Sequence, residues 1–177
     1  MSIKKVVVIG PESTGKSSLS EALALHLNTV WVPEYARTYL EALNQPYRES
    51  DLLHIAKGQL QAEDQLKGKA NRFLICDTDL YVIKVWSEHS YRRCNQWVLQ
   101  QIAIRSYDLY LLSDIDVPWT SDPLREHPET TMRNYFYQVY LDIVQNSGVP
   151  FQLVRGTTEE RLALSLNAVS NLESLRR

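Results

Sequence analysis

The sequence predicts an α/β fold in which helices flank both faces of a five-stranded parallel sheet. Two observations predict it: five short apolar runs resemble buried strands, and most segments between them repeat apolar residues at helical spacing. Strands that alternate with helices pair in parallel, because each crossover returns the chain to the same end of the sheet. The 177 residues are 44% hydrophobic and contain no repeat or Gly/Ser-rich linker, so we expect a single domain over 1–177.

The first expected strand, at residues 6–9, is a continuous β-branched run, Val-Val-Val-Ile. Further strands are expected at 30–32, 73–76, 109–112 and 151–154. Four of the remaining segments carry helical apolar stripes, and Thr157 with Glu160 forms a candidate capping box at the start of the last one. The stripes are Leu19, Leu23 and Leu27; Leu52, Ala56 and Leu60; Phe136, Val139, Tyr140, Ile143 and Val144; and Leu162, Leu166, Val169 and Leu172.

Composition argues against several classes of protein. A formal net charge of −2 and a pI near 6.1 disfavour a nucleic-acid-binding protein, which usually carries a basic excess. Cys76 and Cys94 show neither metal spacing nor a CxxC motif, and we expect two buried free thiols. The apolar run at the start is too short for a signal peptide or membrane span, so we expect a cytoplasmic protein with no membrane partner. The sequence leaves the oligomeric state open.

The loop after the first strand carries a phosphate-binding motif. Residues 10–17 read Gly-Pro-Glu-Ser-Thr-Gly-Lys-Ser and match G-x-x-x-x-G-K-[ST] between a strand and a helix. The glycines let backbone N–H groups wrap the phosphates, Lys16 reaches the β- and γ-phosphates, and Ser17 offers a hydroxyl to Mg²⁺. The motif predicts bound ATP and Mg²⁺. The expected nucleotide-binding residues here are Gly10, Ser13, Thr14, Gly15, Lys16, Ser17 and Ser18.

Carboxylates follow the second and third strands, at the sheet edge where ligands of such folds bind. Glu34 could accept a hydroxyl proton or hold sugar hydroxyls, with Arg37 within reach of the same site; a surface ion pair between them is the alternative. Asp77 is expected to hold Mg²⁺ directly or through water, together with Ser17. Asp79 could contact the acceptor, but both aspartates also suit a helix N-cap.

The polar segment 113–129 predicts a lid that closes over the phosphates. Arg125 within it could stabilise the charge on the transferring γ-phosphoryl group, although pairing with a neighbouring glutamate is the alternative. Trp119 is expected to stack on a flat ring, whereas Trp31 and Trp97 are expected to pack in the core. After the fifth strand, Arg155 is expected to line the nucleotide site. The four histidines show no metal spacing and are expected at the surface.

These motifs together resemble the ribosylnicotinamide kinase domain of NadR-type proteins. The matching pieces span nearly the whole chain: residues 10–17, Glu34-Tyr35-x-Arg37, Ser50-Asp51, Asp77-Thr78-Asp79 and Trp119-x-x-Asp122-x-x-Arg125. The resemblance implies transfer of the γ-phosphate of ATP to the 5′-hydroxyl of nicotinamide riboside, a small nucleoside-like acceptor. The expected catalytic residues are Lys16, Glu34, Asp77 and Arg125; the expected acceptor-binding residues are Glu34, Tyr35, Arg37, Asp79, Trp119 and Asp122.

The chain departs from the family pattern at two points. NadR-type proteins usually carry an adenylyltransferase domain before this one, and we expect the kinase domain alone here. Riboside-binding members are expected to place an aromatic residue just before the Glu-Tyr pair, where this chain has Pro33. Two alternatives therefore stay open: a kinase for another nucleoside or metabolite hydroxyl, or an ATP-dependent regulatory switch. A GTPase switch would need an N-K-x-D segment, which the sequence lacks.

Overall fold

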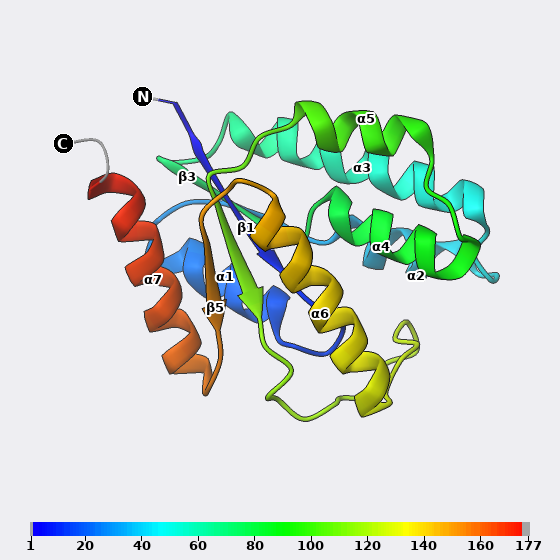
Figure 1. Ribbon diagram of the computed structural model, residues 1–177. Coiled ribbons are helices and arrows are strands. Elements are labelled where there is room, and N and C mark those ends of the chain that lie inside the picture. The colour runs from blue at the N-terminus through cyan, green and yellow to red at the C-terminus, as the bar shows by residue number, and fades with distance from the viewer. Residues whose placement is uncertain (1, 175–177) are drawn as a thin grey trace.

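A five-stranded parallel sheet with the order β2-β3-β1-β4-β5 forms the centre of the protein (Figure 1). The structure is a computed structural model and describes residues 2–174. The central strand β1 pairs with β3 on one side and β4 on the other, so that Val6 lies opposite both Ile75 and Leu109. The strands are β1 (Lys4–Ile9), β2 (Trp31–Val32), β3 (Phe73–Asp77), β4 (Leu109–Ser113) and β5 (Phe151–Val154).

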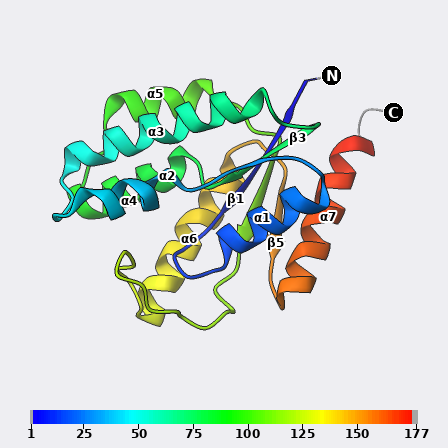
Figure 2. The same ribbon diagram turned by 180° about the vertical axis from the view of Figure 1, so that it is seen from behind.

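Helices cover both faces of this sheet, as Figures 1 and 2 show from opposite sides. One face packs against α1 and α7, and the other against α3, α4 and α6. The helices α2 and α5 pack on α3 and α4 and build a third cluster away from the sheet. The helices are α1 (Lys16–His26), α2 (Tyr35–Leu43), α3 (Glu49–Lys67), α4 (Leu80–Tyr91), α5 (Gln96–Ile104), α6 (Thr130–Asn146) and α7 (Thr158–Ser174).

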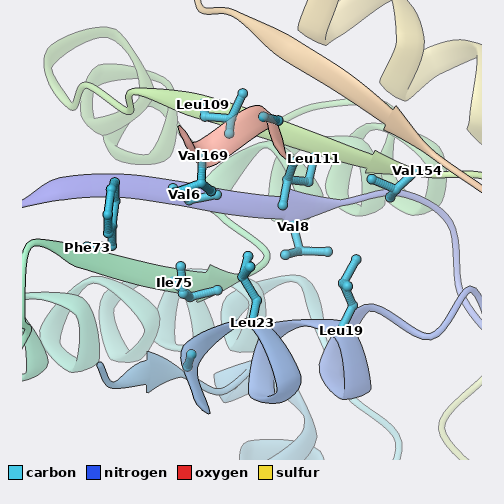
Figure 3. Close-up of a cluster of buried hydrophobic side chains, with 12 residues drawn as sticks. Val6, Val8, Leu19, Leu23, Phe73, Ile75, Leu109, Leu111, Val154 and Val169 are labelled. Carbon is cyan, nitrogen blue, oxygen red and sulfur yellow. The ribbon is translucent and has the colours of Figure 1, made fainter. Parts of the chain in front are cut away.

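The central strand divides its side chains between the two cores. Val6 and Val8 contact the cluster that includes Leu19 and Leu23 of α1 (Figure 3), whereas Val7 and Ile9 belong to the cluster on the opposite face. Alternate residues of a strand point to opposite faces, and a strand buried on both faces must therefore be apolar throughout. This explains why the run of four β-branched residues predicts a central strand.

The predicted fold class and all five predicted strands are confirmed, with ends that shift by at most two residues. The predicted capping box also forms: the Glu160 carboxylate accepts the Thr157 N–H at 2.7 Å, and the Thr157 hydroxyl accepts the Glu160 N–H at 3.3 Å. Ser113, expected in the lid, is instead the last residue of β4.

Three helices, α2, α4 and α5, were not predicted. Both cysteines are free, but Cys94 is half-buried rather than buried. No helix within residues 2–174 combines the length and the hydropathy that crossing a bilayer requires.

Candidate active site

The turn that joins β1 to α1 has the backbone of a phosphate-binding loop. Gly10 has φ 144°, and a Cβ atom there would lie 2.8 Å from the carbonyl oxygen of Ser113. Gly15 has φ 75° and is the N-cap of α1, so the helix begins at Lys16. Residues with side chains rarely adopt these φ values, which is why both positions favour glycine. The positive end of the α1 dipole and its free N–H groups therefore face the loop.

Internal hydrogen bonds help to hold the shape of this loop. The Thr14 hydroxyl donates to the Pro11 carbonyl oxygen at 2.8 Å, and the Lys16 ammonium group donates to the same oxygen at 2.7 Å. Behind the loop, the buried Arg161 of α7 donates to the Thr14 carbonyl oxygen at 3.0 Å and pairs with Asp116. The lysine is thus held over the concave side of the loop, where its charge is available to an anion.

Ser17 and Asp77 meet beside the loop. The Ser17 hydroxyl donates to Asp77 Oδ2 at 2.5 Å, while the buried Oδ1 has no hydrogen-bond partner among the described residues. Burial raises the pKa of Asp77, and the nearby Lys16 counters this rise. A hydroxyl beside a carboxylate with a free oxygen fits Mg²⁺, which prefers oxygen ligands and usually shares them with phosphates. The N-cap of α4 is Asp79, so Asp77 is not the helix cap.

Glu34 follows β2 and lines the same cavity as Lys16. Burial raises the pKa of the Glu34 carboxyl group, Lys16 opposes the rise, and Asp77 adds to it. The expected alternative, a surface ion pair with Arg37, is not what the structure contains, because the Arg37 guanidinium contacts Asp122 at 2.9 Å and Glu41 at 3.5 Å.

The cavity has a volume of about 420 Å³, within the usual range for small-molecule sites. Residues 10–18 line one part of it, Glu34 also lines it, and a largely aromatic and apolar set of side chains lines a second part. That second part takes its side chains from α2, α4 and α6 and from the loop before α3. They include Leu40, Tyr47, Val85, Trp86, His89, Phe136 and Tyr140. An anion-binding end and an apolar end thus share one cavity.

The segment 114–129, between β4 and α6, lies against the phosphate loop. The Thr120 N–H donates to Ser13 Oγ at 2.8 Å, and the Arg125 guanidinium donates to the same oxygen at 3.3 Å. Arg125 also donates to the Thr120 carbonyl oxygen at 2.5 Å, and Asp122 pairs with Arg37 of α2. Arg125 therefore contacts Ser13 and Thr120 rather than Glu126 or Glu129, the pairing that the sequence left open, and it lines the cavity.

Six residues expected to bind the metal or a ligand lie outside the cavity lining: Tyr35, Asp77, Asp79, Trp119, Asp122 and Arg155. Asp79 is buried and accepts hydrogen bonds from Tyr81 N–H at 2.9 Å and Tyr110 Oη at 2.8 Å, which is the helix-cap alternative. Trp119 lies under Arg133, whose guanidinium is 5.8 Å from the ring centroid. The Tyr35 ring packs against Gly58 of α3, and Arg155 is exposed. These placements argue against the roles expected for Asp79 and Trp119.

Several residues of the cavity were not found from the sequence. His89 and His127, expected at the surface, place their ring centroids 5.0 Å apart in the cavity wall and both contact Phe136. Glu12 occupies a variable position of the phosphate-loop motif, where no residue type is specified. Tyr140 belongs to an apolar stripe that only indicated a helix. The sequence carried no signal that these side chains meet, because they come from four separate elements.

The fold and site together define an α/β protein with a phosphate-binding loop. The chain belongs to the AAA_28 family, an AAA domain, whose model matches residues 5–161. It is 28% identical over 157 residues to the trifunctional NAD biosynthesis/regulator protein NadR of Salmonella typhimurium, an alignment that covers 86% of this chain and 38% of the relative. NadR of Escherichia coli is 28% identical over 153 residues, covering 84% and 37%. The chain thus spans less than two fifths of the length of these relatives.

Solved structures share the fold. A NadR protein in complex with NR superimposes with a TM-score of 0.79 at 24% identity, covering 97% of this chain and 52% of that chain. NadR with NAD and AMP-PNP gives the same TM-score at 23% identity, covering 97% and 50%. The deoxyadenosine kinase from M. mycoides gives a TM-score of 0.60 at 17% identity, covering 94% and 99%.

Proposed function

We propose that this chain is an ATP-dependent kinase that phosphorylates the 5′-hydroxyl of nicotinamide riboside to give nicotinamide mononucleotide. The observation that carries the proposal is that Lys16 and Glu34 line a single cavity with an anion-binding end and an aromatic end. Phosphoryl transfer needs a donor phosphate and an acceptor hydroxyl held in line, so a shared cavity is its first requirement. NadR relatives, including one solved with NR, support this choice of acceptor.

Each residue near the phosphate loop has a role in this reaction. The loop N–H groups and Lys16 bind the phosphates, and Arg125 neutralises charge on the γ-phosphoryl oxygens. Glu34 takes the proton of the acceptor hydroxyl while the hydroxyl oxygen attacks the γ-phosphorus. The bond between the γ-phosphorus and the bridging oxygen of the β-phosphate breaks, and ADP leaves. The raised pKa of Glu34 favours proton acceptance. Ser17 and Asp77 would hold Mg²⁺, which supplies positive charge to the phosphates when bound.

One feature favours a second acceptor. Pro33, which precedes Glu34, is exposed and offers no aromatic ring to a pyridine base. A kinase of the same mechanism that acts on another nucleoside is therefore the runner-up.

An acceptor panel tests the proposal. The full chain, ATP and Mg²⁺ are incubated with nicotinamide riboside, adenosine, cytidine and thymidine, and the products are identified by mass spectrometry. We expect nicotinamide riboside to have the highest kcat/KM. A nucleoside that exceeds it would replace it as the acceptor, and hydrolysis of ATP with no phosphorylated acceptor would overturn the kinase assignment.

A further inference from the structure

Glu12 is a carboxylate inside a loop that is built to hold anions. Its negative charge opposes phosphate binding, so its position in the loop calls for a physical explanation. The side chain lines the cavity, and its Oε2 accepts the backbone N–H groups of Glu126 at 3.0 Å and His127 at 3.3 Å. Hydrogen bonds from N–H groups to a charged acceptor are among the stronger ones in proteins. Glu12 therefore connects the phosphate loop to the far end of segment 114–129.

The two residues that Glu12 holds also contact the aromatic part of the cavity. The His127 ring lies against His89 and Phe136 at centroid distances of 5.0 and 5.1 Å. The Glu126 carboxylate accepts a hydrogen bond from Tyr47 Oη at 3.4 Å. The Tyr47 oxygen in turn accepts the indole N–H of Trp86 at 2.8 Å. A continuous set of contacts thus runs from the phosphate loop to the wall of the second part of the cavity.

The residue before this pair is Arg125, which contacts Ser13, the neighbour of Glu12. Two consecutive residues of the phosphate loop therefore hold three consecutive residues of the lid. A shift of the lid at Glu126 would displace Arg125 on one side and His127 on the other.

We propose that Glu12 is a positioning residue that fastens residues 126 and 127 to the phosphate loop and thereby places Arg125 and the His127 wall for transfer. The inference rests on the proposed kinase function and adds to it a coupling between the phosphate and acceptor parts of the cavity. Glu12 acts through an oxygen that accepts two N–H groups, so an amide oxygen can replace it and a methyl group cannot. A residue that exchanged a proton with substrate would lose its role in both replacements.

Hydrogen exchange tests the fastening without any acceptor. In Glu12→Ala the amides of Glu126 and His127 lose their acceptor, and we expect them to exchange at least about tenfold faster than in the wild type, as opened hydrogen bonds do. Glu12→Gln should retain most of the protection. Glu21→Ala, which removes an exposed glutamate of α1, should exchange like the wild type and serves as the matched control. Unchanged exchange in Glu12→Ala would overturn the proposal.

Kinetics test the coupling. We expect Glu12→Ala to lower kcat about tenfold and to raise the KM of the acceptor, while Glu12→Gln stays within about threefold of the wild type, in line with the loss of hydrogen bonds to a charged group. In the Arg125→Ala background, Glu12→Ala should lower kcat by a much smaller factor, because the residue it places is gone. Equal loss in Gln and Ala variants, or additive losses with Arg125, would contradict the positioning role.

These measurements distinguish failure of the positioning role of Glu12 from failure of the proposed kinase function. Fast exchange in Glu12→Ala together with no transfer by the wild type to any acceptor would overturn the kinase assignment and keep the fastening. Phosphate transfer by the wild type, together with unchanged hydrogen exchange and kinetics in Glu12→Ala, would overturn the fastening and keep the kinase assignment. Thermal melting of each variant separates a local effect from loss of the fold.

Discussion

Three carboxylates surround the phosphate loop, and their surroundings give them different roles. Asp77 is buried against the Ser17 hydroxyl, Glu34 faces the cavity beside Lys16, and Glu12 accepts N–H groups of segment 114–129. Asp77 is therefore suited to bind a cation, Glu34 to accept the proton of a substrate hydroxyl, and Glu12 to accept backbone N–H groups. Substitutions by the matching amide separate these roles, because they remove the charge and nearly preserve the shape.

The acceptor role of Glu34 predicts a split between two reactions. Glu34→Gln should lower phosphate transfer to the acceptor about 10²-fold or more, because general-base assistance is lost. Slow hydrolysis of ATP by water should persist, since it depends on the phosphate loop and the cation. Both rates are measured on one preparation. A parallel fall of the two rates, or no fall in either, would remove Glu34 from the acceptor site.

The cation role of Asp77 predicts a shift in metal dependence. Asp77→Asn should require at least about tenfold more Mg²⁺ for half-maximal activity, because a carboxylate ligand is replaced by a neutral one. Asp142→Asn, an exposed position on α6, is the control. A Mg²⁺ titration that superimposes on that of the wild type would show that Asp77 does not serve the metal.

The contrast between Asp77 and Asp79 shows what single residues reveal in a sequence. Two aspartates after an apolar strand predict a carboxylate at the sheet edge, and Asp77 lies there. The sequence does not say that Thr78 adopts φ 71° between them, or that Tyr110 of β4 donates to Asp79. Such a contact joins residues 31 positions apart, and only the folded chain determines it.

At the scale of elements, the sequence pattern located the helices whose apolar residues recur at helical spacing over two turns or more. These are α1, α3, α6 and α7. In α4 the run Leu80 to Trp86 is apolar except for Lys84, and period alone does not distinguish such a run from a buried strand. Asp79 is the N-cap at the start of α4. Asn95 is the N-cap at the start of α5, where its side chain accepts the Trp97 N–H at 2.9 Å. Cap residues would therefore have located both helices.

The segment 114–129, which we expect to act as a lid, makes a prediction at this scale. Arg125→Lys keeps the positive charge and loses the planar guanidinium that reaches both Ser13 and Thr120, so kcat should fall about tenfold or more while the affinity for ATP changes less. The control is Arg93→Lys, at an exposed arginine that pairs with Glu49. If kcat of Arg125→Lys equalled that of the control, the lid would contribute no cation to transfer.

At the scale of the whole molecule, the sheet order explains why the site lies where it does. The loops after β1, β2, β3 and β4 all emerge at the same edge, because all strands are parallel. Arg161 joins the loops after β1, β4 and β5 from behind, through Thr14, Asp114 and Gly156. The sequence predicted that ligands bind at this edge of the sheet, but it did not predict the role of the buried Arg161. The pattern in α7 singled out only its apolar residues.

The buried Asp79 predicts a pH dependence of stability. Burial raises the pKa of Asp79 to about 7, whereas an aspartate in an unfolded chain has a pKa of about 3.9. Between these values the unfolded chain releases the proton first, so the contribution of Asp79 to stability falls as the pH rises from about 4 to 7.

Asp79→Asn keeps an acceptor for the Tyr81 N–H and removes this titration. The melting temperature of the variant relative to that of the wild type should therefore rise between pH 5 and pH 8. Melting curves at the two pH values provide the comparison. A difference between the two proteins that stays constant with pH would show that Asp79 does not titrate in this range.

The central claim is that the phosphate loop and the aromatic part of the cavity belong to one kinase site. The most direct measurement is the transfer of labelled γ-phosphate from ATP to nicotinamide riboside by the wild type and by Lys16→Ala, with thermal melting of both proteins. We predict labelled nicotinamide mononucleotide from the wild type, and a folded Lys16→Ala protein with turnover reduced at least about 10³-fold, because the cation on the transferring phosphate is lost. Equal turnover by a folded Lys16→Ala protein, or no labelled product from the wild type, would contradict the account.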